Sequence, residues 1–153
     1  MEIEKKISEL GYTLTIPPKP LAAYVPCIKS ENLVFTAGQL PLKDGKLIYS
    51  GKVGLDLTEE DAIKAAELSA LNCLSVIKAE IGDLDLIERI IKVTVFVNSN
   101  ADYTKHPTIA NGASEFLLKV FGENGKHARS AVGVSSLPLN APVEVELIAK
   151  LKT

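Results

Sequence analysis

Apolar residues recur every three or four positions between Thr58 and Gly82, and this spacing predicts an amphipathic helix. Thr58 can cap its first turn, acidic residues follow, and Gly82 is a natural stop signal. A second helix is predicted over residues 107–121, because Pro107 suits a first helical turn and Gly122 ends the pattern. The apolar stripe of the first helix consists of Ile63, Ala66, Ala70, Cys73, Leu74, Ile77 and Ile81.

Five shorter segments are rich in β-branched or alternating apolar residues, which is typical of strands. Ahead of the first long helix, residues 42–57 are punctuated by glycines and predict a long loop with short extended pieces. The resulting order is β-β-α-β-α-β-β, which indicates an α+β fold with one sheet and both helices packed on one face. The predicted strands are residues 23–29, 32–37, 87–97, 129–135 and 143–151.

The chain has 153 residues, a length that predicts a single globular domain. Residues 1–20 are expected to form an appendage on this domain. They combine a short helix over residues 2–10 with a proline-rich extension that favours an extended wrap over the surface. The globular domain is then expected to span residues 21–153.

The last two predicted strands bring charged side chains together if they pair as an antiparallel hairpin. In the final strand the odd positions form one apolar face, so Glu144 and Glu146 point to the other. The same pairing places Arg129 beside the two glutamates. This arrangement is either a binding surface or an ordinary cross-strand ion pair, which contributes little to stability. The hairpin would bury Val132, Val134, Val143, Val145, Leu147 and Ala149, and would leave Ala131 and Gly133 beside the charged group.

Composition narrows the class of protein. With 17 basic and 19 acidic residues the net charge is −2, which disfavours a nucleic-acid surface, since that requires clustered positive charge. Cys27 and Cys73 match no Cys/His ligand spacing, so no metal site is expected. The N-terminus shows no basic-then-apolar signal sequence. No apolar run approaches the ~20 residues that span a bilayer, so a cytoplasmic protein without a membrane partner is expected.

Four stretches stand in an order and spacing that match a known family. They are Ala23-Tyr24-Val25, Thr36-Ala37-Gly38-Gln39-Leu40-Pro41, Lys92-Val93-Thr94-Val95-Phe96-Val97, and the C-terminal Arg129-Ser130-Ala131-Val132-Gly133-Val134 with Leu137-Pro138 and Val143-Glu144-Val145-Glu146. Together they resemble the YjgF/Rid (reactive intermediate deaminase) family, also labelled endoribonuclease L-PSP-like. The resemblance covers roughly residues 21–152, and the additional N-terminal segment and the 42–57 loop resemble a longer subgroup.

The resemblance implies a chorismate-mutase-like fold, assembled as a homotrimer with a ligand site in each cleft between subunits. Known members hydrolyse imine or enamine intermediates to 2-keto acids and ammonia, and no cofactor or metal is implied. By the same resemblance, Arg129 would hold the carboxylate of a small-molecule substrate, and Glu144 would position or deprotonate the attacking water. The implied substrate-binding residues are Tyr24, Ala37, Gly38, Asn111 and Ala131.

The chain departs from the common family pattern at several positions. Ala37 stands where many members carry serine, and His127 stands where proline is frequent. His127 is expected to pack or bind at the subunit edge rather than to take part in catalysis. Ser114 has no nearby partner in the sequence that marks it as a nucleophile.

Three functions remain open from the sequence. The first is hydrolysis of reactive imines, and the second is a non-catalytic, regulatory module that binds small carboxylates on the same scaffold. The third is endoribonuclease-like activity, against which the acidic balance and the lack of a basic-aromatic stripe count.

Overall fold

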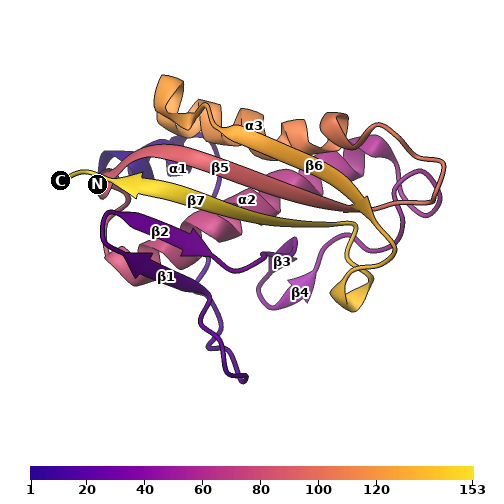
Figure 1. Ribbon diagram of the computed structural model, residues 1–153, viewed down its shortest axis with the longest axis horizontal. Helices are drawn as coiled ribbons and strands as arrows, with labels where there is room; N and C mark the ends of the chain where they lie inside the picture. The colour runs from indigo at the N-terminus through magenta and orange to yellow at the C-terminus, as the bar shows by residue number, and fades with distance from the viewer.

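The computed structural model describes all residues, 1–153, and is organised around one five-stranded sheet with the order β1-β2-β7-β5-β6 (Figure 1). Strand β7 lies in the middle, antiparallel to both β2 and β5, whereas β6 pairs with β5 in parallel. The strands are β1 (Cys27–Ser30), β2 (Leu33–Thr36), β5 (Ile87–Asn98), β6 (Ala128–Val134) and β7 (Val143–Leu151).

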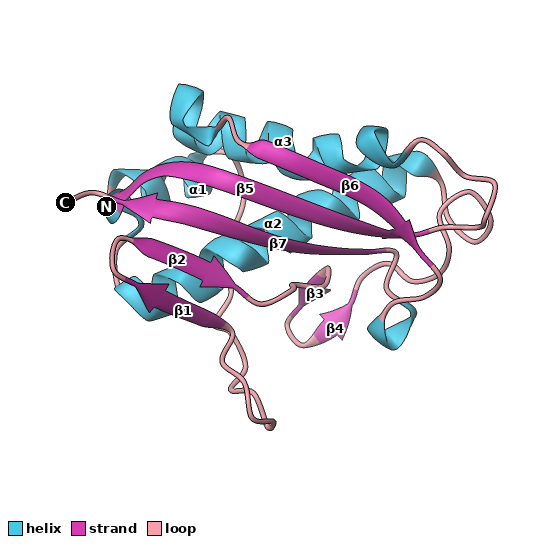
Figure 2. Cartoon of the chain, in the orientation of Figure 1, coloured by secondary structure: helices cyan, strands magenta, loops and turns pink.

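Two long helices, α2 (Glu59–Ile81) and α3 (His106–Phe121), cover one face of this sheet (Figure 2). The Thr58 side chain accepts a hydrogen bond from the Asp61 amide, which confirms the predicted cap of α2. The helices approach closely at Gly112, where an added Cβ would lie 2.1 Å from the carbonyl oxygen of Ile63. The predicted fold class, one sheet with both helices on one face, is therefore confirmed.

The hydrophobic core fills the layer between the sheet and the two helices. The odd positions of β7 are buried against it, as the alternation in the sequence predicts. Its largest fully buried side chains include Leu74, Ile77, Ile90, Ile109, Phe116, Leu117 and Leu147.

The predicted pairing of the last two strands is wrong. Strands β6 and β7 run in opposite directions, but β5 lies between them. The physical reason is the crossover β5-α3-β6, which places β6 parallel to β5 at the sheet edge, and the connection after β6 is too long to force a hairpin.

Because β5 lies between β6 and β7, the side chains of β6 lie on the opposite faces of the sheet from those predicted. Arg129 is in register with Val93, and Val93 with Leu147, so Arg129 starts from the face that the helices cover. Val132 is 45% exposed and lies in the row of Glu144, on the open face of the sheet. Ala131 packs against the core, and neither it nor Gly133 lies beside the glutamates.

The N-terminal segment begins with α1 (Glu2–Glu9), whose Ile7 is buried in the core. The Asp85 carboxylate accepts hydrogen bonds from the amides of Glu2 and Ile3, which ties this helix to the domain. The segment that leads into β1 then projects from the body of the molecule (Figure 1). Within the predicted 42–57 loop, β3 (Leu42–Lys43) and β4 (Lys46–Leu47) form a small ribbon. None of the helices combines the length and the apolar character that crossing a membrane requires.

Candidate functional site

Arg129 on the edge strand β6 is held by two neutral side chains of α3. Its Nη1 donates hydrogen bonds to Asn111 Oδ1 at 2.8 Å and to Ser114 Oγ at 3.1 Å. Asn111 and Ser114 are three residues apart, so they share one face of the helix. No carboxylate forms an ion pair with Arg129, and its Nε and Nη2 have no hydrogen-bond partner within the chain. The guanidinium is therefore held through Nη1, while its Nε and Nη2 donors are not used within the chain.

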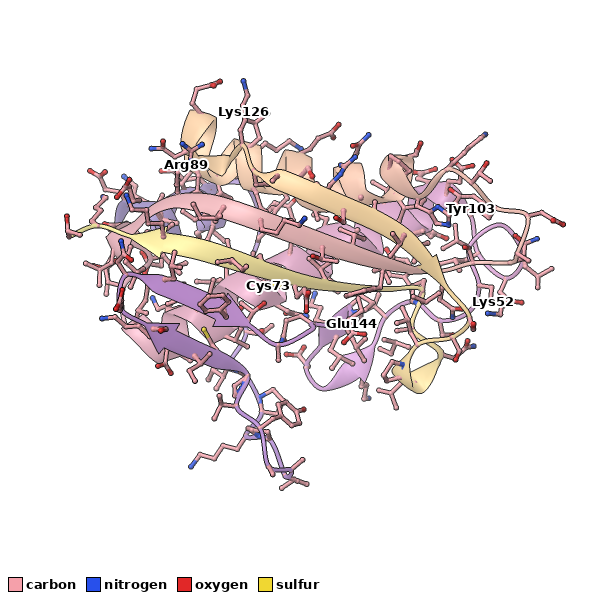
Figure 3. All side chains as sticks on the ribbon, in the orientation of Figure 1. Lys52, Cys73, Arg89, Tyr103, Lys126 and Glu144 are labelled. Atoms are coloured by element: carbon pink, nitrogen blue, oxygen red, sulfur yellow. The ribbon has the colours of Figure 1, made fainter.

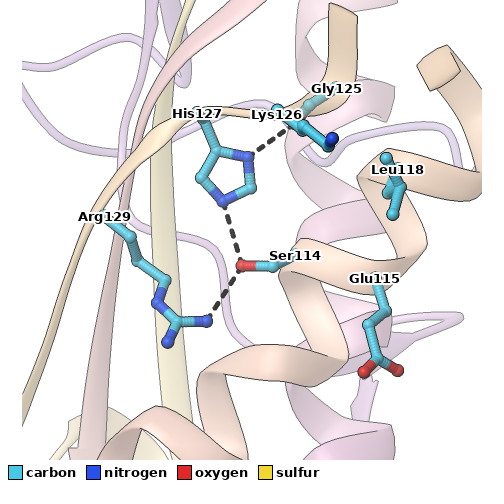
Figure 4. Close-up of a pocket in the computed structure, with 7 residues that line it drawn as sticks. All are labelled: Ser114, Glu115, Leu118, Gly125, Lys126, His127 and Arg129. Carbon is cyan, nitrogen blue, oxygen red and sulfur yellow. Dashed lines mark hydrogen bonds between the residues drawn. The ribbon is translucent and has the colours of Figure 1, made fainter. Parts of the chain in front are cut away.

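His127 and Ser114 extend this cluster, as Figure 4 shows. Ser114 Oγ lies 2.9 Å from His127 Nε2, and His127 Nδ1 lies 2.7 Å from the carbonyl oxygen of Gly125. Burial, and to a smaller extent the nearby positive charge of Arg129, lower the pKa of His127 below its usual value, although the Gly125 carbonyl opposes this. The imidazole is thus neutral near pH 7.

An open hollow of about 380 Å³ lies beside these side chains. The space is adequate for a small molecule. One hydrophobic residue, Leu118, lines it together with Ser114, Glu115, Gly125, Lys126, His127 and Arg129.

Glu144 lies on β7, on the opposite face of the sheet. Its carboxylate has neither a hydrogen bond nor an ion pair within the chain, and its side chain packs against Gly38, where an added Cβ would lie 2.1 Å from Glu144 Oε1. Burial raises the pKa of Glu144, and the neighbouring Glu146 raises it further. A carboxylate with a raised pKa and no partner has the properties of a general base.

The backbone pairing between β2 and β7 ends after Phe35, which leaves a gap in the ladder beside Glu144. The Thr36 hydroxyl replaces a ladder bond by accepting from the Leu147 amide at 3.0 Å, and contact with β7 resumes when the Gln39 amide donates to the carbonyl of Val145. The intervening Gly38 makes no backbone hydrogen bond within the chain. This gap leaves a free amide and a free carboxylate side by side.

The predicted residues thus fall into two clusters rather than one. Arg129 and Asn111 form the first, while Ala37, Gly38 and Glu144 form the second. From standard strand spacing, Arg129 and Glu144 are separated by two strands and three residues, about 14 Å between Cα positions, and they emerge on opposite faces. In Figure 3 Glu144 lies near β3, far from Lys126 at the edge of the hollow.

Tyr24 and Ala131 belong to neither cluster. Tyr24 is 60% exposed on the projecting segment before β1, and Ala131 packs inward toward the core. Ala131 lies on the same face of β6 as Arg129, two residues further along the strand.

Sequence reasoning missed Ser114 and set His127 aside. The signal for both was present: Ser114 follows Asn111 at helical spacing, and His127 precedes Arg129 by two positions on a strand. Only the packing of α3 on β6 brings the serine and the histidine into contact.

One group of carboxylates has the spacing of a metal site, formed by Glu4, Asp83 and Asp85. These groups already have structural partners. Glu4 accepts from Lys78 Nζ, Asp85 holds the start of α1, and Asp83 caps a short 3₁₀ helix over Leu84–Leu86. Glu4 Oε2 is buried and has no hydrogen-bond partner within the chain, so these contacts do not satisfy every oxygen of the cluster.

The fold and site define a small α+β domain that presents an unpaired arginine at a sheet edge and an unpaired glutamate on an open sheet face. The chain belongs to the YjgF/chorismate mutase-like family, whose model, described as "putative endoribonuclease", matches residues 5–151.

The chain is also similar to individual known proteins along most of its length. A crystal structure of Atu1372 from Agrobacterium tumefaciens, of unknown function, shares 44% identity with a TM-score of 0.92, covering 98% of this chain and 92% of that one. Protein TCP17 of Trypanosoma cruzi is 39% identical, over 97% of this chain and 94% of its own length. A structure of E. coli TdcF with bound serine has 27% identity and a TM-score of 0.64, covering 90% of this chain and 94% of that one.

Proposed function

We propose that this protein hydrolyses reactive imine or enamine intermediates of amino-acid metabolism to 2-keto acids and ammonia. The observation that carries the proposal is Arg129, which is ordered by Asn111 and Ser114 yet has no carboxylate partner. An arginine fork of this kind binds a carboxylate through two parallel hydrogen bonds. That TdcF was crystallised with serine, an amino acid with a free carboxylate, supports the same ligand class.

The reaction requires one group that holds the substrate carboxylate and one group that positions the attacking water. An imine carbon is already electrophilic, so a substrate held by its carboxylate requires only a correctly placed nucleophile. Glu144 suits the task of removing a proton from that water, because burial raises its pKa toward neutrality. Water adds to the carbon, a carbinolamine forms, and its carbon–nitrogen bond breaks to leave the keto acid and ammonia.

A single chain cannot apply Arg129 and Glu144 to one small substrate, because they lie on opposite faces of the sheet. We therefore propose that a second copy of this chain completes the site, in a homotrimer with a cleft between neighbouring subunits. The open sheet face supports this arrangement, since it has no covering layer and exposes apolar side chains such as Ile28 and Val132 on the same face as Glu144. The exposed Tyr24 on the projecting segment is suitably placed to reach a neighbouring copy.

The direct test is a panel of amino-acid-derived imines, generated in situ, with keto acid and ammonia measured as products. The wild-type protein is expected to accelerate at least one of them, and Arg129→Ala is expected to lose this activity. Arg89→Ala is the matched control, because Arg89 is the only other arginine and bonds just the carbonyl of Lys126. A protein that leaves every imine at the buffer rate, or that works equally well without Arg129, refutes the proposal.

One observation favours a second candidate, a module that binds small carboxylates without turnover. The Arg129 cluster is complete within one chain and does not need Glu144. In this case 2-ketobutyrate would raise Tm through Arg129 while every imine assay stays blank. Endoribonuclease activity, which the family description names, gains no support from the site, because no phenylalanine, tyrosine or tryptophan lines the hollow for a base to stack on.

A further inference from the structure

We propose that Ser114 and His127 form a proton-transfer pair beside Arg129, in which Ser114 Oγ contacts the substrate and His127 accepts its proton. This inference rests on the imine hydrolysis proposed above and adds a second proton-handling group to Glu144. It assigns Ser114 a catalytic role and His127 a positioning and proton-storing role behind it.

The hydrogen bonds around the pair leave one consistent arrangement of protons. Gly125 offers only a carbonyl oxygen, so His127 Nδ1 must carry the hydrogen of that bond. In the neutral ring Nε2 is then an acceptor, and it receives the Ser114 hydroxyl proton over 2.9 Å. Arg129 Nη1 can only donate, so Ser114 Oγ accepts from it at 3.1 Å. Ser114 is thus polarised from both sides, with its proton directed at the imidazole.

The charges around His127 favour the neutral, proton-accepting ring at pH 7. Arg129 on β6, Lys126 just before it and Arg89 on β5 are positive, while Glu115 on α3 is negative and lines the same hollow. Lys126 is paired with Glu123 at 2.9 Å on the surface, which limits its effect. Burial is the main reason that the pKa of this histidine is lowered, and the positive charge of Arg129 lowers it further.

A specific step suits this pair. The substrate enters as the protonated imine. After Glu144 of a neighbouring copy has taken a proton from the attacking water, hydroxide has added to the carbon and the substrate is a neutral carbinolamine whose carboxylate remains on Arg129. Its new hydroxyl group is bonded to the carbon next to that carboxylate, within reach of Ser114 Oγ. Ser114 takes the hydroxyl proton as its own proton passes to His127 Nε2, the carbonyl forms and the carbon–nitrogen bond breaks. The protonated Glu144 returns its proton to the leaving nitrogen, and His127 releases the other to solvent, so protons and charge balance.

The decisive variant is His127→Gln, because glutamine can accept a hydrogen bond from Ser114 but cannot take up a proton. With an imine that the wild type hydrolyses, we expect KM to be unchanged and kcat to fall on the order of 10²-fold. Ser114→Ala is expected to produce a similar loss, and the double variant should be no worse than either single one, since the two residues act as a unit. Full kcat in His127→Gln would overturn the inference, because it would show that the histidine only positions Ser114.

The pH profile separates proton transfer from packing. Because the neutral imidazole is the active form, wild-type kcat should fall as the pH drops through the His127 pKa, below the usual 6.5 for histidine. His127→Gln should lack this limb. His106→Gln is the matched control, since His106 forms the chain's other serine–histidine contact, with Ser99 at 3.4 Å, and has no arginine beside it. An acid limb that survives in His127→Gln but disappears in His106→Gln would refute the assignment.

A readout independent of turnover distinguishes failure of the pair from failure of the proposed function. Nitrogen-15 NMR of the two histidines at pH 7 should show His127 protonated on Nδ1 and unprotonated on Nε2. Adding 2-ketobutyrate should shift the Nε2 resonance in the wild type and leave it unchanged in Arg129→Ala. The opposite tautomer would contradict the proposed proton-transfer pair even if imines are hydrolysed. So would an Nε2 resonance that does not respond to a carboxylate that does bind. The predicted tautomer with no turnover of any imine contradicts the pair's catalytic role together with the proposed function.

Discussion

Two glycines offer a matched test of the site, because a methyl group at either would meet an oxygen at the same distance. At Gly38 an added Cβ would lie 2.1 Å from Glu144 Oε1, and at Gly112 it would lie 2.1 Å from the carbonyl oxygen of Ile63. The first oxygen ends a flexible side chain on an open sheet face. The second belongs to the backbone of α2, which is packed against α3 and cannot withdraw.

Gly38→Ala is therefore expected to damage function while sparing the fold. Ordinary contact begins near 3.4 Å, so the Glu144 carboxylate must move by more than 1 Å. Misplacing a catalytic group by this much costs on the order of 10²-fold in rate. Gly112→Ala should instead cost about 2 kcal/mol of unfolding free energy through overpacking. For a chain of this size that lowers Tm by about 4–8 °C.

The assay measures imine hydrolysis and thermal unfolding of both variants beside the wild type. The account requires Gly38→Ala to keep its Tm within about 3 °C, since replacing glycine by alanine also stabilises slightly through the unfolded chain. Wild-type kcat in a folded Gly38→Ala protein would refute the role given to Glu144. A Tm loss at Gly38 as large as that at Gly112 would refute the geometric reasoning itself.

Three further predictions concern buried or half-buried groups. Thr36→Val should lower the unfolding free energy by about 1–3 kcal/mol in urea titrations, because it leaves the Leu147 amide unpaired, and Thr36→Ser should restore it. Burial raises the pKa of Cys73 to about 12 and that of Cys27 to about 11, so a thiol reagent at pH 8 should modify neither in the native protein and both in denaturant. The pKa of Glu144 is raised on folding, so its charge opposes folding above the usual carboxyl range and this cost disappears as the pH falls. Glu144→Gln should therefore be more stable than the wild type at pH 7 but not at pH 3, and equal stability at both would contradict the assigned burial.

Local patterns predicted most elements of this fold. The cap at Thr58, the stop at Gly82 and the alternation in β7 are set by neighbouring residues, so they can be read without knowledge of the rest of the chain. The order of the strands in the sheet is not local information. Alternation in β7 predicts which side chains share a face, but not whether β5 or β6 lies beside them.

The same distinction explains what the sequence could say about the site. Arg129 and Glu144 were singled out by family motifs, and the parity argument that united them depended on a hairpin that does not form. Ser114 became visible only when α3 was packed on β6, because its partner His127 is 13 residues away. The proposed cleft between subunits is harder still to predict from one sequence, since it depends on a second copy of the chain.

The central claim is that Arg129 of one subunit and Glu144 of its neighbour serve the same substrate. The direct test co-assembles equal amounts of Arg129→Ala and Glu144→Gln protomers, each inactive alone, and measures imine hydrolysis by the isolated mixed oligomers. A cleft shared between neighbours predicts that about a third of the sites in the mixed trimers regain both groups, with a matching return of activity. Mixed oligomers that stay inactive would show that the two residues do not act across a subunit boundary, and would contradict the account.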